Sequence, residues 1–339
     1  MRSNRMPTRR AVTTITPQRI SFAGGGTDLP RYYEANEGSV ISSAIDQYIY
    51  VTVKKHSKLF KEEFRLSYSK TEHVDDVNKI ENGIARECIK LLDIDGPLYI
   101  STAADLPASS GLGSSSSFAV GLLHALHTIK GERVSASQLA EEACQVEIEC
   151  LKNPIGKQDQ YAAAFGGLNH FTFKTNGRVI IDHMVIENNL LDYIFDNSLL
   201  VWSGVQRDAN NILSAQNEKV ETRTSQYEIL KNDTLRMKEY LLNPDKELLN
   251  NVGSMLERSW QIKKGVEETI TNEGIEDIHT LIRKNGSLGG KLSGAGGGGF
   301  FFEIIPKSKQ PKIIEMYGSS RVIKIKHEPL GSRILSEVW

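Results

Sequence analysis

The sequence predicts an α+β fold with two domains, and three observations support this prediction. The chain has 339 residues, which favours two domains and leaves ample length for a large core. Segments of strand and helix character follow one another without the regular alternation of a parallel βαβ sheet. The composition, with 39% hydrophobic and 24% charged residues, is typical of a globular protein. We place the boundary between residues 166 and 190 and expect domains at 1–180 and 181–339.

The charge balance gives no sign of a nucleic-acid or membrane partner. Lys and Arg total 41 against 42 for Asp and Glu, so the net charge is -1. The sequence contains no apolar run of the length that crosses a bilayer. The first eleven residues carry four arginines but no apolar stretch, so we do not expect a secretory signal. The three cysteines show neither metal-ligand spacing nor a disulfide framework, which favours a reduced, cytoplasmic location.

The first half of the chain mixes strands with helices. Runs rich in Ile, Val, Tyr and Ser predict strands at 19–23, 39–55, 63–70 and 97–104. Helices are expected at 78–92, 118–130 and 135–152. The second of these has an apolar stripe that includes Leu122 and Ile129, and it stops at Gly131. The third begins with the capping box formed by Ser135 and Gln138.

The second half groups its elements differently. Strands are expected at 168–174, 179–186, 198–203, 300–305 and 322–326, and helices near 208–242, 246–265 and 274–285. This order, with strands and helices in separate groups, is the main reason for an α+β prediction.

Residues 107–117, Pro-Ala-Ser-Ser-Gly-Leu-Gly-Ser-Ser-Ser-Ser, are the most informative segment. They follow an expected strand and lead directly into an apolar helix. Glycines allow close backbone approach, and the free N–H groups at a helix N-terminus attract an anion, so the loop predicts a phosphate site. The hydroxyls of Ser114, Ser115 and Ser116 add donors and a candidate Mg²⁺ ligand. The alternative is a serine-capped helix after a flexible turn.

A second polar turn follows the first expected strand. Gly24, Gly25 and Gly26 precede Thr27 and Asp28, so the turn presents a carboxylate that can accept hydrogen bonds from sugar hydroxyls. Arg19 lies on the strand before it. The alternative is a tight turn in which Asp28 caps the backbone.

Two further carboxylates are candidates for metal binding and catalysis. At α-helical spacing, Glu147 lies at the edge of an apolar stripe, whereas Glu149 faces solvent. A half-buried carboxylate needs a partner, which would be a metal ion or a structural ion pair. Asp159 follows a Pro- and Gly-containing loop and is a candidate general base, or alternatively a helix N-cap.

Residues 291–299, Lys-Leu-Ser-Gly-Ala-Gly-Gly-Gly-Gly, contain G-x-G-x-x-G, but the context contradicts a dinucleotide site. That fingerprint needs a strand before it and a helix after it, and here a strand is expected afterwards. We expect these glycines to pack a backbone against another phosphate-binding element.

Three of these segments together, at 17–30, 107–116 and 291–299, resemble the motifs of the GHMP kinase superfamily in order and spacing. The resemblance spans nearly the whole chain. The first motif, Ala-Gly-Gly-Gly-Thr-Asp-Leu-Pro, looks like that of the sugar anomeric kinases acting on D-glycero-D-manno-heptose 7-phosphate, with fucose kinases as the nearest competitors. The resemblance implies an N-terminal domain of the ribosomal S5 domain 2 type, a C-terminal ferredoxin-like domain and a site between them.

The resemblance also implies roles for individual residues. ATP would be bound by Pro107, Ser110, Gly111, Leu112, Gly113, Ser114, Ser115 and Ser116. Ser115 and Glu147 would ligate Mg²⁺, and Asp159 would take the proton from the anomeric hydroxyl. Arg19 would stabilise the attacking oxygen. The sugar would contact Gly25, Gly26, Thr27 and Asp28, and its phosphate would contact Arg31 and Arg207, although each arginine could instead form a surface ion pair.

The implied activity is phosphorylation of O1 of the heptose 7-phosphate, which gives the 1,7-bisphosphate for GDP-heptose and surface polysaccharide synthesis. A fucose-like 1-kinase that acts on unphosphorylated sugars is the alternative within enzymes. An inactive sugar-binding regulator is disfavoured because Asp159, Ser115 and Glu147 are all present. The Gly-Gly-Gly-Thr-Asp segment disfavours an isoprenoid decarboxylase. The sequence leaves open whether the protein is a homodimer.

Overall fold

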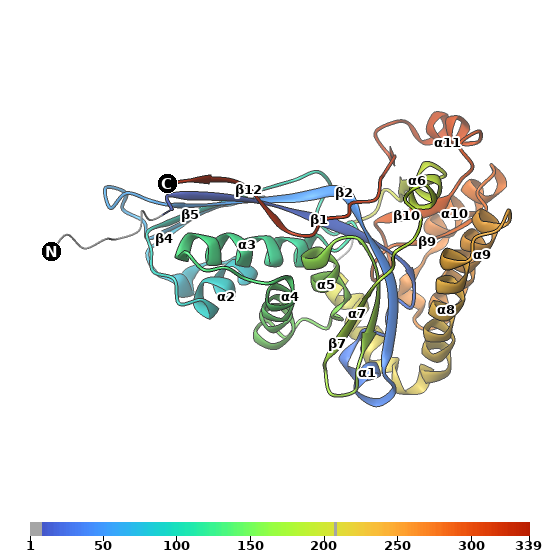
Figure 1. Cartoon of the computed structure of the whole chain (residues 1–339), viewed down its shortest axis with the longest axis horizontal. Coiled ribbons are helices and arrows are strands. Elements are labelled where there is room, and N and C mark those ends of the chain that lie inside the picture. Colours follow the sequence, from blue (N-terminus) through green and yellow to red (C-terminus); the bar gives the residue numbers. More distant parts are fainter. Residues whose placement is uncertain (1–8, 207–208) are drawn as a thin grey trace.

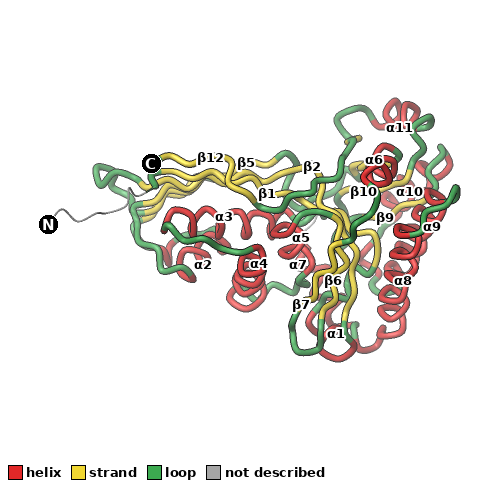
Figure 2. Tube along the Cα trace, viewed as in Figure 1, coloured by secondary structure: helices red, strands yellow, loops and turns green. Residues whose placement is uncertain are grey.

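The computed structural model describes residues 9–206 and 209–339 and is built around two β-sheets (Figures 1 and 2). Within these residues, eight strands form the larger sheet, in the order β12-β1-β2-β5-β3-β4, with β6 paired to β2 and β7 paired to β6. Its strands are β1 (Ala11–Ala23), β2 (Gly38–Lys55), β3 (Phe64–Ser67), β4 (Thr71–Val74), β5 (Leu98–Ala104), β6 (Leu168–Phe173), β7 (Val179–His183) and β12 (Arg333–Val338).

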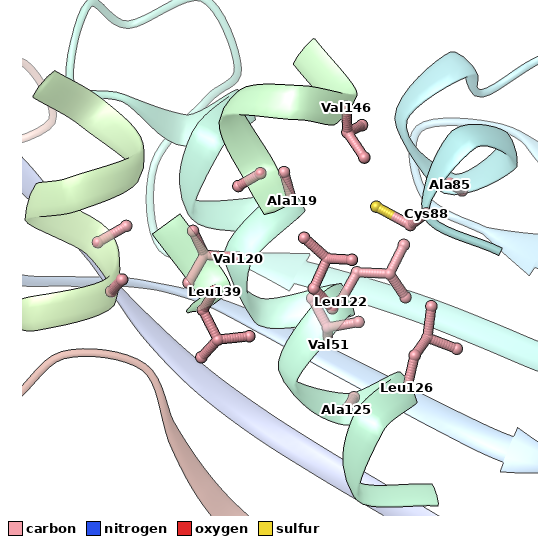
Figure 3. Packing of buried hydrophobic residues seen from close by; sticks show 14 of the residues in the cluster. Val51, Ala85, Cys88, Ala119, Val120, Leu122, Ala125, Leu126, Leu139 and Val146 are labelled. Atoms are coloured by element: carbon pink, nitrogen blue, oxygen red, sulfur yellow. The ribbon is translucent and has the colours of Figure 1, made fainter. Parts of the chain in front are cut away.

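Helices cover one face of the larger sheet (Figure 1). They are α2 (Gly83–Leu91), α3 (Ser114–Lys130), α4 (Ala136–Cys144) and α5 (Gln158–Phe165), with the short turns η1 (Val77–Lys79) and η2 (Gln145–Cys150) beside them. Figure 3 shows the core between α3 and the sheet, where Val120 and Leu122 lie near Val51, Leu139 and Cys88. All five side chains are buried, so α3 is held rigidly against the sheet and its N-terminus has a fixed position.

The long strands β1 and β2 serve two different cores. β2 pairs with β6 through residues 38–43 and with β5 through residues 49–55, and its pairing with β1 shifts register after Pro17. Beyond this shift, Ile20 and Phe22 of β1 belong to a second core that they share with the C-terminal part of the chain. The ring of Phe22 meets that of Phe302 edge-on, with centroids 5.6 Å apart. The two parts of the chain therefore share a packed interface.

The smaller sheet has the order β11-β8-β10-β9. Its strands are β8 (Ser198–Trp202), β9 (Gly289–Leu292), β10 (Phe300–Ile304) and β11 (Val322–Ile323). The helices of this part are α6 (Asn188–Asp196), α7 (Ala209–Lys219), α8 (Thr224–Leu242), α9 (Leu248–Lys264), α10 (Glu273–Lys284) and α11 (Gln310–Tyr317), with η3 (Glu221–Arg223) and η4 (Glu268–Ile270). In the part of the chain described by the structure, no helix is both long and apolar enough to span a membrane.

The predicted α+β class is confirmed, whereas several individual elements differ from the predictions. The expected helix at 208–242 is interrupted, because its described residues form α7, η3 and α8. The short helices α1 (Pro30–Asn36), α6 and α11 and the strands β4, β9 and β12 were not anticipated. β9 begins with a glycine pair, and β12 is largely exposed and has its apolar residues in no regular alternation, so neither has the pattern of a half-buried strand.

The last strand, β12, returns to the larger sheet after the chain has formed the smaller one. β12 pairs antiparallel with β1, with Ala11 opposite Val338, so the end of the chain lies in the larger sheet. The change from the larger to the smaller sheet falls between β7 and β8, near the predicted boundary region. The division into 1–180 and 181–339 stays a prediction, and it must allow for the return of β12.

A buried histidine joins three elements of the C-terminal part. His279 of α10 donates to Glu303 of β10 at 2.9 Å and to Glu257 of α9 at 2.8 Å, and His279 and Glu303 are buried. Burial opposes protonation, but the hydrogen bonds to Glu257 and Glu303 outweigh it and raise the pKa of His279 to about 9. The charged imidazolium therefore stabilises α9 against the smaller sheet.

We expect this interaction to make stability pH-dependent. Because the pKa of His279 is raised in the folded state, its contribution is complete below pH 6.5 and is lost as the pH rises through about 9. At low pH the wild type should have a higher free energy of unfolding than His279→Gln. This difference should fall by about 3 kcal/mol as the pH rises from 6.5 to above about 9. Urea unfolding at several pH values measures it. His73→Gln, at an exposed histidine, should keep the wild-type profile. A constant difference between wild type and His279→Gln would contradict the assignment.

Candidate active site

The loop at 107–113 meets the requirements of a phosphate site. It leads into α3, whose N-cap is Gly113 with φ +82° and no capping side chain, so the alternative of a serine-capped helix is wrong. Gly111 also has φ +82°, a conformation that favours glycine. Ser114, Ser115 and Ser116 form the first turn of α3, where backbone N–H groups have no acceptor within the helix. The backbone and the helix dipole together favour an anion at this point.

A partly buried ion pair lies directly beside this loop. Arg19 of β1 donates through Nε and Nη2 to the two carboxylate oxygens of Asp159, at 2.7 and 2.6 Å. Its Nη1 donates to the carbonyl of Gly111 at 2.8 Å. Asp159 lies in the first turn of α5, whose N-cap is Lys157, so the N-cap interpretation of Asp159 is wrong. The pair joins the first strand, the loop and α5 in one rigid arrangement.

Gly113 is required for this arrangement. A Cβ at Gly113 would lie 3.2 Å from Oδ2 of Asp159, which is closer than most side chains tolerate. Glycine therefore allows the start of α3 to approach the carboxylate. The approach brings a candidate proton acceptor next to the loop that would hold the transferred phosphoryl group.

Glu147 is more deeply buried than its α-helical spacing predicts. It has no exposed surface and lies in η2, a π-helical turn that widens the helix after α4. Its carboxylate accepts hydrogen bonds from the hydroxyl of Ser115, from that of Ser116 at 2.7 Å and from the Gln160 amide at 2.7 Å. Glu149 is exposed, as predicted. In the described residues Glu147 forms no ion pair, so the alternative of a structural ion pair is not supported.

This neighbourhood fits a magnesium ion. Burial raises the pKa of the Glu147 carboxyl, because no described cation compensates its charge. Mg²⁺ prefers carboxylate and hydroxyl oxygens and is usually held by one or two carboxylates together with substrate phosphates. Ser115 and Glu147 supply such oxygens at the edge of the phosphate loop. Among the described residues no cluster of three Asp, Glu, His or Cys side chains forms a metal site, so the phosphates of a nucleotide would complete the ligand set.

Asp28 both shapes the turn and lines the site. Its carboxylate accepts from the backbone N–H of Gly26 at 3.0 Å and from that of Gln158, the first residue of α5, at 3.2 Å. Burial and the nearby charge of Asp159 raise the pKa of Asp28. A Cβ at Gly156 would lie 1.9 Å from Oδ2 of Asp28, so a glycine is needed there. The capping interpretation is therefore correct and is compatible with contact to a ligand.

These residues surround one cavity of about 310 Å³ between the two parts of the chain. Most of the predicted site residues line it: Arg19, Gly25, Gly26, Asp28, Ser110, Gly111, Gly113, Ser114, Ser115, Ser116, Glu147 and Asp159. The cavity brings together segments of the first motif, the second motif and the loop before α5, which are far apart in the sequence.

Four predicted residues do not line the cavity. The hydroxyl of Thr27 is buried and donates to the carbonyls of Gly24 and Ser39, both at 2.8 Å, so Thr27 fastens the turn to β2. The Leu112 side chain packs in the second core, and Pro107 is exposed. Arg31 is exposed and donates to the carbonyl of Asn217 at 3.3 Å. Arg207, the other predicted phosphate ligand, lies outside the described residues.

The glycines of the third motif pack against the phosphate loop, as expected. A Cβ at Gly294 would lie 2.6 Å from Cα of Gly111, and one at Gly299 would lie 2.5 Å from the carbonyl oxygen of Ser110. The backbone N–H of Phe300 donates to the same carbonyl at 3.1 Å. Since β10 follows the motif, the prediction that this is no dinucleotide fingerprint agrees with the structure.

Sequence reasoning missed two cations that line the cavity. Lys263 comes from the last turn of α9 and Lys291 from β9. Lys291 begins the third motif, so its position beside the glycines was a usable signal. Lys263 has no such marker, because only the packing of α9 onto β9 brings it to the cavity.

The cavity is suited to the transfer of a phosphoryl group to a hydroxyl. It combines a phosphate loop, a carboxylate held by a cation, and a buried carboxylate beside serine hydroxyls. Comparisons with known proteins agree with this class. The model of the GHMP kinases N terminal domain matches residues 64–167, and that of the GHMP kinases C terminal domain matches residues 237–322.

Relatives cover nearly the whole chain. The D-glycero-alpha-D-manno-heptose 7-phosphate kinase of Campylobacter jejuni is 32% identical over 90% of this chain and 93% of its own length. A galactokinase of Pyrococcus furiosus is 24% identical over 89% of this chain and 91% of its own length. The crystal structure of a D-glycero-D-manno-heptose 1-phosphate kinase from Bacteroides thetaiotaomicron has the same fold, with a TM-score of 0.77 at 21% identity over 96% of this chain and 99% of that chain.

The chain is thus a phosphotransferase with an alcohol group as acceptor. It belongs to the GHMP kinase family, which uses ATP as phosphate donor, and within that family it is a sugar kinase.

The geometry predicts the effect of removing the charge of Asp159. Asp159→Asn should lower kcat by about 10²- to 10⁴-fold, the usual contribution of a positioned general base, while ATP binding persists. Steady-state kinetics and nucleotide titration measure the two quantities. Asp182→Asn removes a carboxylate that is paired to Lys238 outside the cavity and should leave both unchanged. Near-normal turnover by Asp159→Asn would show that this carboxylate is not the base.

Proposed function

We propose that this protein is an ATP-dependent kinase that phosphorylates O1 of D-glycero-D-manno-heptose 7-phosphate. The product is the 1,7-bisphosphate, a precursor of GDP-heptose for surface polysaccharides. The observation that carries the proposal is the placement of Asp28 and the Arg19–Asp159 pair in one cavity with the phosphate loop. The relative with 32% identity supports the choice of heptose 7-phosphate.

In this proposal Asp159 accepts the proton of the anomeric hydroxyl. Arg19 occupies one acceptor site on each carboxylate oxygen, and each oxygen keeps a second site for the substrate. As the proton moves to Asp159, O1 forms a bond to the γ-phosphorus of ATP and the bond from that phosphorus to the bridging oxygen breaks, releasing ADP. Arg19 has further N–H groups that lower the pKa of the attacking oxygen. Asp28 accepts hydrogen bonds from sugar hydroxyls and fixes the ring.

The phosphates of ATP would be held by the loop from Ser110 to Gly113 and by the first turn of α3. Mg²⁺, held by Ser115 and Glu147, would neutralise charge on these phosphates. Most of the rate acceleration would come from positioning and from charge neutralisation, as in other phosphoryl transfers. A role for Arg31 and Arg207 in phosphate binding, a cytoplasmic location and a homodimer all stay predictions.

The magnesium site predicts a change in metal dependence. Ser115→Ala combined with Glu147→Gln should raise the Mg²⁺ concentration for half-maximal rate by at least about 10-fold, because two oxygen ligands are lost. The rate measured over a Mg²⁺ series at saturating ATP tests it. Glu149→Gln, an exposed carboxylate in the same turn, is the matched control. An unchanged Mg²⁺ dependence of the double variant would remove these residues from the metal site.

The acceptor is tested by ATP consumption with a panel of heptose 7-phosphate, mannose, fucose, galactose and mevalonate. We expect turnover only with heptose 7-phosphate, and NMR should then place the new phosphate at O1. Turnover of an unphosphorylated sugar in its place would favour the fucose-like alternative. Such a result would preserve the family and the mechanism but overturn the acceptor.

A further inference from the structure

Lys263 and Lys291 have no role in the mechanism above, although both line the cavity. Both side chains are partly buried. Lys263 donates through Nζ to the carbonyl of Gly294, whereas the side chain of Lys291 has neither a hydrogen bond nor an ion pair within the described residues. An ammonium group that is shielded from water and lacks an acceptor is costly, so the position of Lys291 needs an explanation.

The two lysines differ in the charges around them, because among the described residues carboxylates lie near Lys263 but not near Lys291. Burial lowers the pKa of Lys291 to about 7, and the positive charges of Lys263 and Arg19 add to the effect. Burial also lowers the pKa of Lys263 to about 8, but there the carboxylates of Asp28 and Asp159 oppose it. Lys291 therefore faces cations without a compensating carboxylate. An anion that enters the cavity would favour the charged form of Lys291.

Two residues of α9 that line the same cavity carry neutral donors without a partner in the described part of the chain. The hydroxyl of Ser259 and the indole N–H of Trp260 are buried and have no partner, and the residues are only 5% and 1% exposed. Ser259 precedes Lys263 by one helical turn, so the two side chains lie on the same face of α9. A group that carries several acceptor oxygens would satisfy these donors and the two lysines together.

The glycine contact between α9 and β9 holds these donors in place. A Cβ at Gly289 would lie 2.0 Å from the carbonyl oxygen of Gly253. The helix and the strand therefore pack backbone to backbone, and the pocket exists before a ligand binds. Pre-organised donors lose little freedom on binding, which favours affinity for a small anion.

We propose that Lys263 and Lys291, together with Ser259 and Trp260, bind the terminal phosphate of the acceptor sugar. This inference rests on the proposed function. In the proposed function, the phosphates of ATP are bound by the loop at 107–113, by the start of α3 and, through Mg²⁺, by Ser115 and Glu147. The lysines are therefore not needed for ATP. The lysines come from the other part of the chain, and Lys263 lies within electrostatic range of Asp28, the residue assigned to sugar hydroxyls.

The first test compares two acceptors that differ only in the terminal phosphate. For Lys291→Met and Lys263→Met, kcat/KM with heptose 7-phosphate should fall by about 10- to 100-fold, the value of one lost charged hydrogen bond. With the same heptose lacking the phosphate, kcat/KM should be unchanged, as should KM for ATP. Lys264→Met removes a neighbouring charge that is paired with Glu276 and does not line the cavity, and should match the wild type. Equal losses on both acceptors would assign the lysines to the phosphates of ATP and overturn the inference.

The second test measures binding without turnover. Calorimetry with a non-hydrolysable ATP analogue bound should show that the wild type prefers mannose 6-phosphate to mannose, and that Lys291→Met loses this preference. The melting temperature of Lys291→Met should equal or exceed that of the wild type, because an uncompensated charge is removed. A wild type without the preference, or a variant that keeps it, overturns the inference. Failure of the proposed function is a separate result, namely wild-type turnover of unphosphorylated sugars only.

Discussion

The ion pair between Arg19 and Asp159 is the interaction on which the rest of the site depends. It joins β1 to α5, and through the carbonyl of Gly111 it also holds the phosphate loop. The Arg19 side chain is 6% exposed, so loss of its partner would leave a buried charge uncompensated. In the packed state this pair places a carboxylate next to the loop. The same contacts that hold β1, the loop and α5 together therefore also assemble the candidate site.

Close backbone packing is the second constraint, and it acts between the two parts of the chain. Gly294 lies on Gly111, and β10 donates a backbone hydrogen bond to Ser110. The loop is consequently supported from behind by the smaller sheet while its open side faces the cavity. A rigid loop can present N–H groups to phosphates without reorganising during the reaction, which is the main source of electrostatic catalysis.

The cavity concentrates charges that do not stabilise the free protein. The carboxyls of Asp28 and Glu147 both have pKa values raised by burial, and the pKa values of Lys263 and Lys291 are lowered. In each case burial disfavours the charged form. Buried charges of this kind lower the stability of the fold but favour the binding of a charged ligand. Packing in the second core, with contacts such as Phe22 on Phe302, offsets this loss of stability.

The sequence by itself determined the α+β class, the glycine-serine loop, and the choice of Arg19, Asp159 and Glu147, because these depend on local spacing and on ordered motifs. It did not reveal the π-helical turn that buries Glu147, the inward orientation of Thr27 or the return of β12 to the larger sheet. Lys263 reaches the cavity only because α9 packs on β9, whereas Lys291 had a sequence signal in its position at the start of the third motif. The spacing of residues along a helix or strand predicts only which side chains within one or two turns lie next to each other. The partners of Glu147, Thr27 and Lys263 lie far away in the sequence. Only tertiary packing, with the burial and the charges it brings together, decided which side chains share the cavity.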